Sequence, residues 1–231
     1  MSGKEISIDT TDGVFGGYLA APATANGAGI VIIQEIFGIN RFVRAVADQY
    51  ASRGYFALAP DLFWRLEPGI VLDDRIEAEK NRAFSLFPKF NVDLGVKDIE
   101  AAIHHLRGTE KCTKVGAVGY CLGGLLAYLA ATRTDADASV GYYGVSIEEK
   151  LGEATNIKKP LMLHIAEKDR FVPAAAQKRI RDGLKGNPQV AIHLYPEMDH
   201  AFARVGGENY DPANAELANS RTANFFRQQL G

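Results

Sequence analysis

The stretch that decides the fold is Val115-Gly-Ala-Val-Gly-Tyr-Cys-Leu-Gly-Gly-Leu-Leu-Ala-Tyr-Leu-Ala-Ala131. Its beginning is a short apolar run with valines, which predicts a strand that is buried on both faces. The residues from Leu122 to Thr132 predict a helix, and the glycines between the two segments predict a tight turn. A membrane span would need roughly 18–20 apolar residues without such breaks. The stretch therefore predicts strand, turn and helix.

The turn itself, Gly119-Tyr-Cys-Leu-Gly123, matches the motif G-x-S-x-G with cysteine in the place of serine. In such a turn the nucleophile has a strained backbone, and there is room only for glycine two positions away on either side. The side chain stands at the N-terminus of a helix, where the helix dipole and free N–H groups favour the thiolate. We therefore expect Cys121 to be a nucleophile. The alternative is a small buried apolar side chain, which is the usual role of a free cysteine.

A nucleophile in this kind of turn predicts an acid and then a histidine later in the chain, each in a loop after a strand. Asp169 and His200 occur in that order, and each directly follows an apolar run that predicts a strand. We expect His200 to take the thiol proton and later return it, and Asp169 to orient the imidazole. Glu167 and Asp199 are competing acids that the sequence does not exclude.

The remaining histidines and the second cysteine have simpler explanations. His104 and His105 fall in a predicted helix and are expected to be a solvated pair, whereas His164 and His193 fall in predicted strands and are expected in the core. Cys112 lies in a polar stretch and is expected to be structural. No spacing among the histidines resembles a metal site, and no glycine-rich phosphate-binding motif occurs. We therefore expect no metal and no cofactor.

Strands and helices alternate on both sides of the quoted stretch. Strands are expected at 4–8, 14–20, 29–34, 55–59, 115–119, 139–143, 160–165 and 190–195. Helices are expected at 41–53, 73–88, 92–107, 122–132, 174–185 and 211–230. The dipeptide Asp12-Gly13 predicts a hairpin between the first two strands. The pattern predicts an α/β fold, a mostly parallel sheet with helices on both faces and an antiparallel N-terminal hairpin, as a single domain over 1–231.

Composition excludes several classes of protein. Of the 231 residues, 47% are hydrophobic and 23% are charged, which is typical of a globular chain with a buried core. Lys and Arg number 26 against 28 Asp and Glu, so the basic surface of a nucleic-acid-binding protein is not expected. Two cysteines make no disulfide framework, and the first residues lack the apolar segment of a signal peptide. We expect a cytoplasmic monomer without nucleic-acid or membrane partners.

The chain resembles the dienelactone hydrolase family (carboxymethylenebutenolidases), which are cysteine-dependent α/β-hydrolases that act on lactones. The resemblance spans nearly the whole chain. Its most specific segments are Gln34-Glu-Ile-Phe-Gly38, Pro60-Asp-Leu62, Gly119-Tyr-Cys-Leu-Gly-Gly124, Val140-Gly-Tyr-Tyr-Gly144, Phe171-Val-Pro173 and His200-Ala-Phe-Ala-Arg204. The resemblance implies the α/β-hydrolase fold, with Cys121 as nucleophile, His200 as base and Asp169 as the acid that orients it.

The resemblance also implies roles that the sequence pattern alone does not assign. Glu35 is expected to contact the thiol and an arginine, and to help generate the thiolate once substrate binds. The backbone N–H groups of Ile36 and Leu122 are expected to form the oxyanion hole. Arg204 is expected to bind a carboxylate of the substrate through its planar fork of donors.

Three departures from the family pattern concern the substrate. The second substrate-binding arginine of the family falls on Lys80, which supplies charge without bidentate geometry, and Arg82 two residues later could replace it through a shifted helix. Phe84 stands where the family has a tyrosine, and Ala201 where it has a serine, which predicts a less polar pocket. The candidate substrate contacts are Arg204, Lys80, Arg82, Phe37, Phe84 and Tyr143.

The sequence therefore predicts a cofactor-free hydrolase whose partner is a small lactone or ester. The preferred substrate is a carboxylated enol-lactone such as dienelactone, opened to maleylacetate in aromatic degradation through a Cys121 thioester. The alternatives are a general carboxylesterase or thioesterase with a more apolar leaving group, and a non-catalytic α/β-hydrolase scaffold that binds a small ligand. A nucleotide-binding domain is disfavoured by the missing phosphate motifs.

Overall fold

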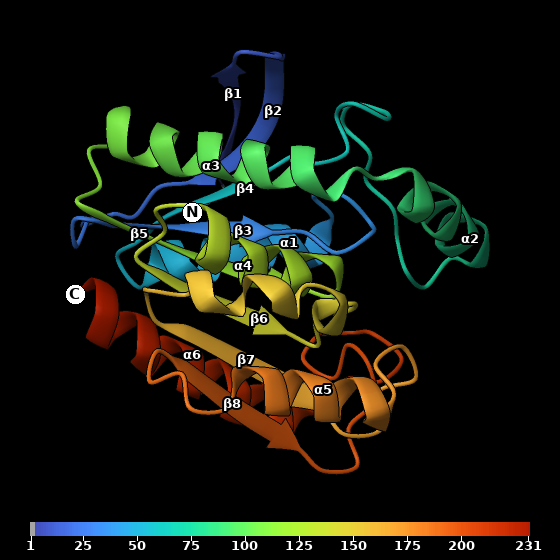
Figure 1. Ribbon diagram of the computed structural model, residues 1–231. Helices are drawn as coiled ribbons and strands as arrows, with labels where there is room; N and C mark the ends of the chain where they lie inside the picture. The colour runs from blue at the N-terminus through green and yellow to red at the C-terminus, as the bar shows by residue number, and fades with distance from the viewer. Residues whose placement is uncertain (1–2) are drawn as a thin grey trace.

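The structure, a computed structural model, describes residues 3–231, and its centre is an eight-stranded sheet (Figure 1). The strands are β1 (Lys4–Thr10), β2 (Gly13–Ala20), β3 (Ala28–Ile33), β4 (Phe56–Pro60), β5 (Lys114–Tyr120), β6 (Ala138–Tyr142), β7 (Leu161–Ala166) and β8 (Val190–Tyr195). The α-helices are α1 (Arg41–Ser52), α2 (Glu77–Leu86), α3 (Val92–Gly108), α4 (Leu122–Arg133), α5 (Ala174–Leu184) and α6 (Pro212–Leu230). Three short 3-10 helices that the sequence pattern did not predict are η1 (Phe87–Lys89), η2 (Ile147–Glu149) and η3 (Leu151–Asn156).

The strands lie in the order β1-β2-β4-β3-β5-β6-β7-β8. The hairpin β1–β2 is antiparallel, and β2 also pairs antiparallel with β4, whereas β4, β3 and β5 to β8 run parallel to one another. The predicted α/β fold with an antiparallel entry is confirmed. Because β3, β5, β7 and β8 are parallel, the loops that follow them meet at one edge of the sheet, where ligands bind in such folds.

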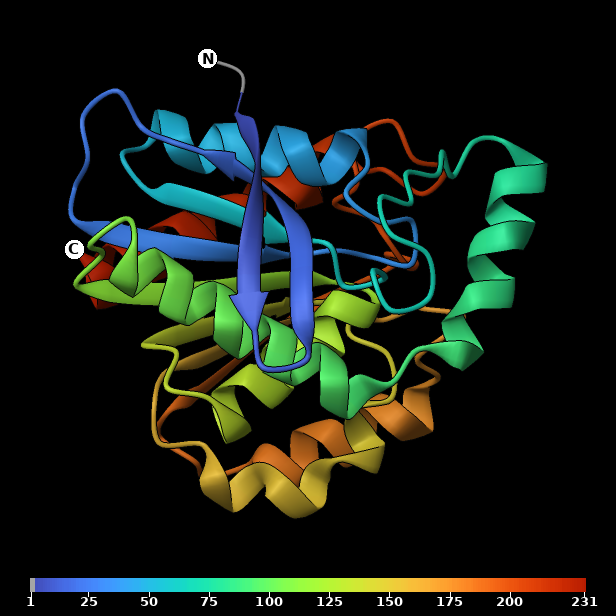
Figure 2. The ribbon, with the colours of Figure 1, turned by 90° about the horizontal axis from the view of Figure 1, so that it is seen from above.

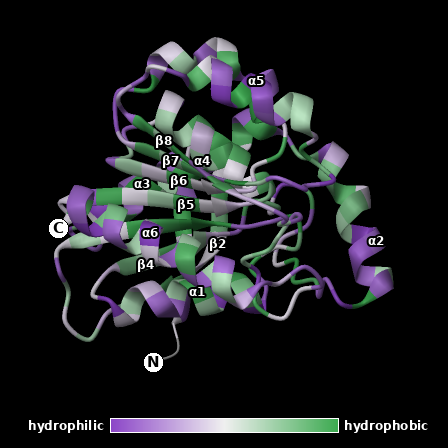
Figure 3. Cartoon of the chain, turned by 90° about the horizontal axis from the view of Figure 1, so that it is seen from below, coloured by the Kyte–Doolittle hydropathy of each residue, from purple (hydrophilic) through white to green (hydrophobic). Residues whose placement is uncertain are grey.

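Helices cover both faces of the sheet, and each face has its own apolar cluster. Helices α3, α4 and α5 cover one face, and α1 and α6 cover the other (Figure 1). All six residues of β3 are buried, and the buried side chains of α4 include its middle residues from Leu125 to Ala130. This burial explains why both segments are apolar over their whole length. Apolar residues line the strands between the helices, while polar ones lie on the outer helix surfaces (Figure 3).

Helix α2 stands apart from the two layers, at the edge of the sheet where the parallel strands end (Figure 2). It begins at Glu77, one turn later than the expected residue 73. The delay arises because Asp73 forms a turn, in which its Oδ1 accepts from the backbone N–H of Arg75 at 3.0 Å. Its own N–H donates to Glu79 at 2.6 Å. Helices α1, α3 and α6, in contrast, begin at the side-chain caps of Asn40, Asn91 and Asp211.

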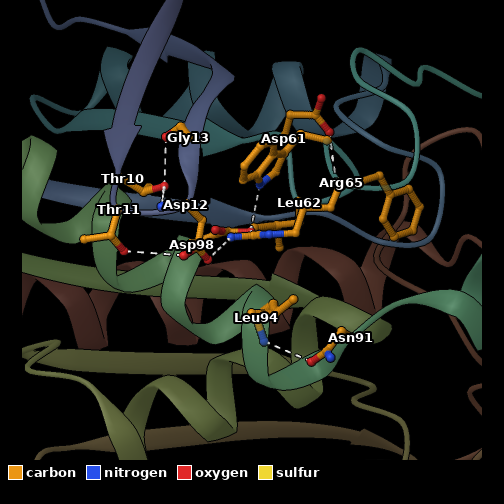
Figure 4. Close-up of polar contacts among 12 residues, drawn as sticks. Thr10, Thr11, Asp12, Gly13, Asp61, Leu62, Arg65, Asn91, Leu94 and Asp98 are labelled. Atoms are coloured by element: carbon orange, nitrogen blue, oxygen red, sulfur yellow. Dashed lines mark hydrogen bonds and ion pairs between the residues drawn. The ribbon is translucent and has the colours of Figure 1, made fainter.

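A buried polar network ties the N-terminal hairpin to the body of the molecule (Figure 4). Arg65 pairs with Asp12 of the hairpin turn at 2.8 Å and with the buried Asp98 of α3. The indole N–H of Trp64 donates to the same Asp98 oxygen at 3.0 Å, and the Trp64 ring stacks on Phe15 of β2. Burial raises the pKa of Asp98, and its hydrogen bonds to Arg65 and Trp64 oppose that effect.

Within residues 3–231, no helix is both long and apolar enough to cross a membrane.

Candidate active site

The turn after β5 holds Cys121 in a strained conformation. Its backbone angles are φ 57° and ψ −115°, a region that residues with a Cβ seldom adopt. A Cβ on Gly119 would lie 1.9 Å from the carbonyl oxygen of Gly123, and one on Gly123 would lie 2.4 Å from that of Ile33. Both glycines are therefore required by close backbone contacts. The turn leaves Cys121 half-buried and directly before the first residue of α4.

The loops after β7 and β8 bring the predicted acid and base together. His200 Nδ1 lies 2.9 Å from Asp169 Oδ2, and both side chains are buried. The other oxygen of Asp169 accepts from the backbone N–H groups of Phe171 and Val172, which fixes the carboxylate. Of the two competing acids, Asp199 pairs with Arg170 instead, and Glu167 is exposed.

The surroundings of His200 shift its pKa strongly. Burial lowers the pKa, but the charge of Cys121 and the hydrogen bonds to Asp169 and Cys121 outweigh it and raise the pKa to about 10. The rings of Tyr143 and Phe171 stand edge-on to the imidazole, with centroids 5.1 Å and 4.9 Å away. The arrangement favours the charged imidazolium, which lies between aromatic rings that limit the access of water.

Glu35 and Arg204 form a second charged pair at the same edge of the sheet. Glu35 follows β3 and is 1% exposed; its Oε2 accepts from Arg204 Nη1 at 3.0 Å, while its Oε1 is buried without a hydrogen-bond partner in residues 3–231. The Arg204 guanidinium lies over the Phe37 ring, 5.3 Å from its centroid. Burial lowers the pKa of Arg204, but the charge of Glu35 outweighs it and raises the pKa. A charged Glu35 is therefore compensated, as a buried carboxylate must be.

The two backbone amides expected to form the oxyanion hole have no hydrogen-bond acceptor in the described chain. Leu122 is the first residue of α4, so its N–H has no acceptor within the helix. Ile36 lies in the turn after β3, and its N–H donates to no other group of residues 3–231. Both residues are buried, and Ile36 lines the cavity beside Cys121. Their N–H groups can bind a developing oxyanion if it lies between them.

A cavity of about 510 Å³ opens above these residues. It is lined by Ile36, Phe37, Asp74, Arg75, Lys80, Phe84, Phe87, Cys121, Val145, Arg170, Phe171, His200, Arg204, Gly206, Gly207, Glu208 and Asn209. Four of the six predicted substrate contacts therefore line the cavity, namely Arg204, Lys80, Phe84 and Phe37. Lys80 is paired with Glu77 at 2.7 Å. Phe84 of α2 meets Phe171 across the mouth, with centroids 6.1 Å apart.

Two predicted substrate contacts lie elsewhere. Arg82 comes two residues after Lys80, which turns it to the other side of α2, where it pairs with Glu67 outside the cavity. In this structure Arg82 therefore does not contribute to the cavity. Tyr143 is buried behind His200, and its hydroxyl has no hydrogen-bond partner in the described chain. Burial raises the pKa of Tyr143 well above its usual range.

Several cavity residues were not predicted from the sequence, chiefly the charged residues Asp74, Arg75, Arg170 and Glu208. They lie in irregular loops, where no periodic pattern indicates which way a side chain points.

Cys112, which was expected to be structural, is buried, and burial raises its pKa to about 11. Residues 3–231 contain no group of three or more His, Cys, Asp or Glu side chains arranged to hold a metal ion.

The sheet order, the strained turn after β5 and the histidine–acid pair define an α/β-hydrolase. The model of the dienelactone hydrolase family matches residues 15–230. A relative from Azospirillum brasilense is 47% identical over 234 residues, covering 98% of this chain and 99% of its own. The carboxymethylenebutenolidase of Pseudomonas putida is 42% identical over 228 residues, covering 98% and 97%. A solved structure from Klebsiella pneumoniae shares the fold, with a TM-score of 0.87 at 24% identity and 98% of both chains covered.

The chain belongs to the dienelactone hydrolase family, and it is a carboxylic ester hydrolase. The resemblance expected from the sequence segments is therefore confirmed. The similarity to the two curated relatives extends over almost the full length of each chain.

Proposed function

We propose that the protein opens a carboxylated enol-lactone of the dienelactone type through a thioester on Cys121. The observation that carries the proposal is the convergence of three groups from separate loops. The strained turn exposes Cys121, and the hydrogen-bonded pair His200–Asp169 supplies a base beside it. The curated relative from Pseudomonas putida, a carboxymethylenebutenolidase, supports the same substrate class.

In the first half of the proposed reaction, the Cys121 thiolate attacks the lactone carbonyl carbon and forms a C–S bond. The oxygen that becomes negative is bound by the N–H groups of Ile36 and Leu122. The ring C–O bond then breaks, and the leaving enol oxygen takes the proton from the His200 imidazolium. Because the substrate is a ring, the leaving group stays attached to the acyl part.

In the second half, His200 takes a proton from water, and the resulting hydroxide attacks the thioester. The C–S bond breaks, the thiolate returns to Cys121, and the carboxylic acid leaves. Asp169 keeps the imidazole in the correct tautomer in both halves. Arg204 lies at the cavity wall, where it can bind the carboxylate of the substrate.

A general carboxylesterase is a second candidate, because one side of the cavity is aromatic. Phe84, Phe87 and Phe171 all line it and are exposed between 37% and 47%. Such a wall suits an apolar leaving group. Dienelactone compared with neutral p-nitrophenyl esters separates the two candidates, and a marked preference for the neutral esters would favour the esterase.

The thioester is tested with Cys121→Ala, matched by Cys112→Ala at the other free cysteine. We expect Cys121→Ala to lose at least about 10³-fold in kcat, because the nucleophile is absent, whereas Cys112→Ala stays active. Acid quenching during turnover, followed by intact mass measurement, should show the wild type heavier by the full mass of the lactone. Turnover by Cys121→Ala at a rate close to that of the wild type would overturn the proposal.

A further inference from the structure

Arg204, the residue proposed to bind a substrate carboxylate, already contacts two carboxylates of this chain. Its Nη1 donates to Glu35 at 3.0 Å, and its Nε lies 3.2 Å from Asp74 Oδ2. The side chains of Arg204 and Asp74 are 14% and 15% exposed, so water screens this contact only in part. Two negative groups therefore face one guanidinium before any substrate enters.

The geometry of a guanidinium makes this arrangement consequential. A carboxylate binds arginine most strongly through two parallel N–H donors on one edge of the fork. Both edges of Arg204 are partly occupied, one at Nη1 by Glu35 and the other at Nε by Asp74. A substrate carboxylate can form a bidentate pair only if one of them moves away.

Of the two partners, Asp74 is the more exposed and the less firmly held. Glu35 is 1% exposed and follows a buried strand, whereas Asp74 lies in the turn before α2. Arg204 Nε also has no hydrogen bond in residues 3–231, so the contact with Asp74 is an ion pair without hydrogen-bond geometry. Such a pair is weaker than a charge-assisted hydrogen bond and is easier to displace.

Asp74 also differs from the acids that pair with the other cations of the cavity. Arg75, Lys80 and Arg170 pair with Asp73, Glu77 and Asp199. None of those three acids lines the cavity, whereas Asp74 does. Among these partners, Asp74 is therefore the acid that a bound substrate would meet directly.

We propose that Asp74 is a specificity-determining residue, whose carboxylate occupies the side of Arg204 that a substrate carboxylate needs. A carboxylated substrate must displace Asp74, and its carboxylate is also repelled by the negative charge of Asp74. Neither effect opposes the binding of a neutral ester. Asp74 thus shifts the preference of the enzyme toward neutral substrates. This inference rests on the proposed function, because it takes the cavity as the substrate site.

Binding of a simple dicarboxylate tests the inference without any turnover. We expect Asp74→Asn to bind succinate roughly three- to tenfold more tightly than wild type in an NMR titration at low ionic strength. The neutral analogue succinamide should show no such gain. Glu208→Gln is the matched control, because Glu208 lines the same cavity and forms no ion pair with Arg204 in the described chain. It removes a negative charge from the cavity but leaves the Arg204 contact intact, so its effect should stay within about twofold.

Equal or weaker succinate binding by Asp74→Asn would overturn the inference, as would an equal gain in Glu208→Gln. The inference would also be overturned if succinate saturated neither the wild type nor Asp74→Asn. Asp74→Ser removes the same carboxylate with a smaller side chain, and it keeps the test decisive if the asparagine variant does not fold.

Turnover separates this inference from the proposed function. Asp74→Asn should raise the ratio of kcat/KM for p-nitrophenyl hemisuccinate over that for p-nitrophenyl acetate by a similar factor. If the wild type hydrolyses neither lactones nor esters, the proposed function fails, yet the succinate titration still decides the role of Asp74. If hydrolysis occurs and the ratio does not rise, only the inference about Asp74 fails.

Discussion

His200 is hydrogen-bonded to Asp169 through one ring nitrogen and has Cys121 as a second neighbour. An isolated imidazole is mostly neutral at pH 7, but these neighbours stabilise the charged form. The pKa of His200 is raised although the ring is 6% exposed, and burial alone would lower it. The contacts of this one residue therefore favour its charged form.

Removing the thiol should therefore change the titration of His200. We expect the imidazole of Cys121→Ala to lose its proton at a lower pH than the wild-type value near 10, because the largest influence that raises the pKa is the charge of Cys121. The Cε1–H chemical shift, followed by NMR from pH 6 to 11, measures this midpoint. Cys112→Ala should titrate like wild type, and identical midpoints in all three proteins would refute the influence of Cys121 on the pKa of His200.

At the scale of single elements, the turn between β5 and α4 shows how little freedom the backbone has. Gly119 and Gly123 approach each other and the end of β3 so closely that a methyl group has no space. The strained φ of Cys121 is maintained by those contacts, since β5 pairs on both sides and α4 is buried along its length.

Gly119→Ala should therefore destabilise the protein by about 3 kcal/mol or more, because the new Cβ meets backbone atoms that cannot move away. Gly16→Ala in β2 is the control, since a Cβ there has nothing within 4 Å. Its stability should stay the same or rise by up to about 1 kcal/mol. Urea unfolding followed by circular dichroism measures both, and a similar loss in the two variants would contradict the close-contact explanation.

Element by element, the sequence predicted most of the structure. Apolar runs and caps are local signals, so the eight strands and the helices appear within a few residues of their expected bounds. Helix α2 is the exception, because the Asp73 turn is made by side chains and not by hydrophobic spacing. The position of the site also followed from local signals, since parallel strands end at one edge.

The contacts made by individual charged side chains could not be predicted in this way. Arg204 and Asp74 are far apart in the sequence, and their approach depends on how two irregular loops fold over the sheet. Arg82 pairs with Glu67 outside the cavity because of its position around the axis of a single helix. The motifs indicated which residues are near the chemistry, whereas three-dimensional packing decided which of them face the cavity.

At the scale of the whole molecule, the Arg65 network is one of the polar attachments between the hairpin β1–β2 and the body, beside the Arg44–Glu5 ion pair and the pairing of β2 with β4. Arg65 connects the hairpin turn to α3, and Asp98 is buried with only one of its two oxygens hydrogen-bonded in the described chain (Figure 4). The charge of Asp98 is therefore tolerated largely because Arg65 lies beside it.

Replacing Arg65 with Met should destabilise the protein by about 2–3 kcal/mol at pH 8, since it leaves a buried carboxylate without its cation. Burial already raises the pKa of Asp98, and loss of Arg65 raises it further. The folded variant then binds a proton that the unfolded chain does not, so its deficit should shrink as the pH falls from 8 to 5. Urea unfolding of variant and wild type at both pH values measures the deficit.

Asp12→Asn is the control for this network, because it removes the more exposed partner of Arg65. It should cost less than about 1 kcal/mol, with the same deficit at both pH values. An equal deficit for Arg65→Met at pH 5 and pH 8 would show that Asp98 does not depend on Arg65 for its charge.

The order of the site residues along the chain has a consequence during synthesis on the ribosome. Cys121 and its turn emerge before β7 and β8, whose following loops carry Asp169 and His200. A nascent chain therefore holds the thiol for a period in which it has no base beside it. An unassisted thiol is mostly protonated at neutral pH and reacts slowly with electrophiles. In the proposed mechanism Asp169 and His200 activate the cysteine, so it becomes reactive only when the sheet that shelters it is complete.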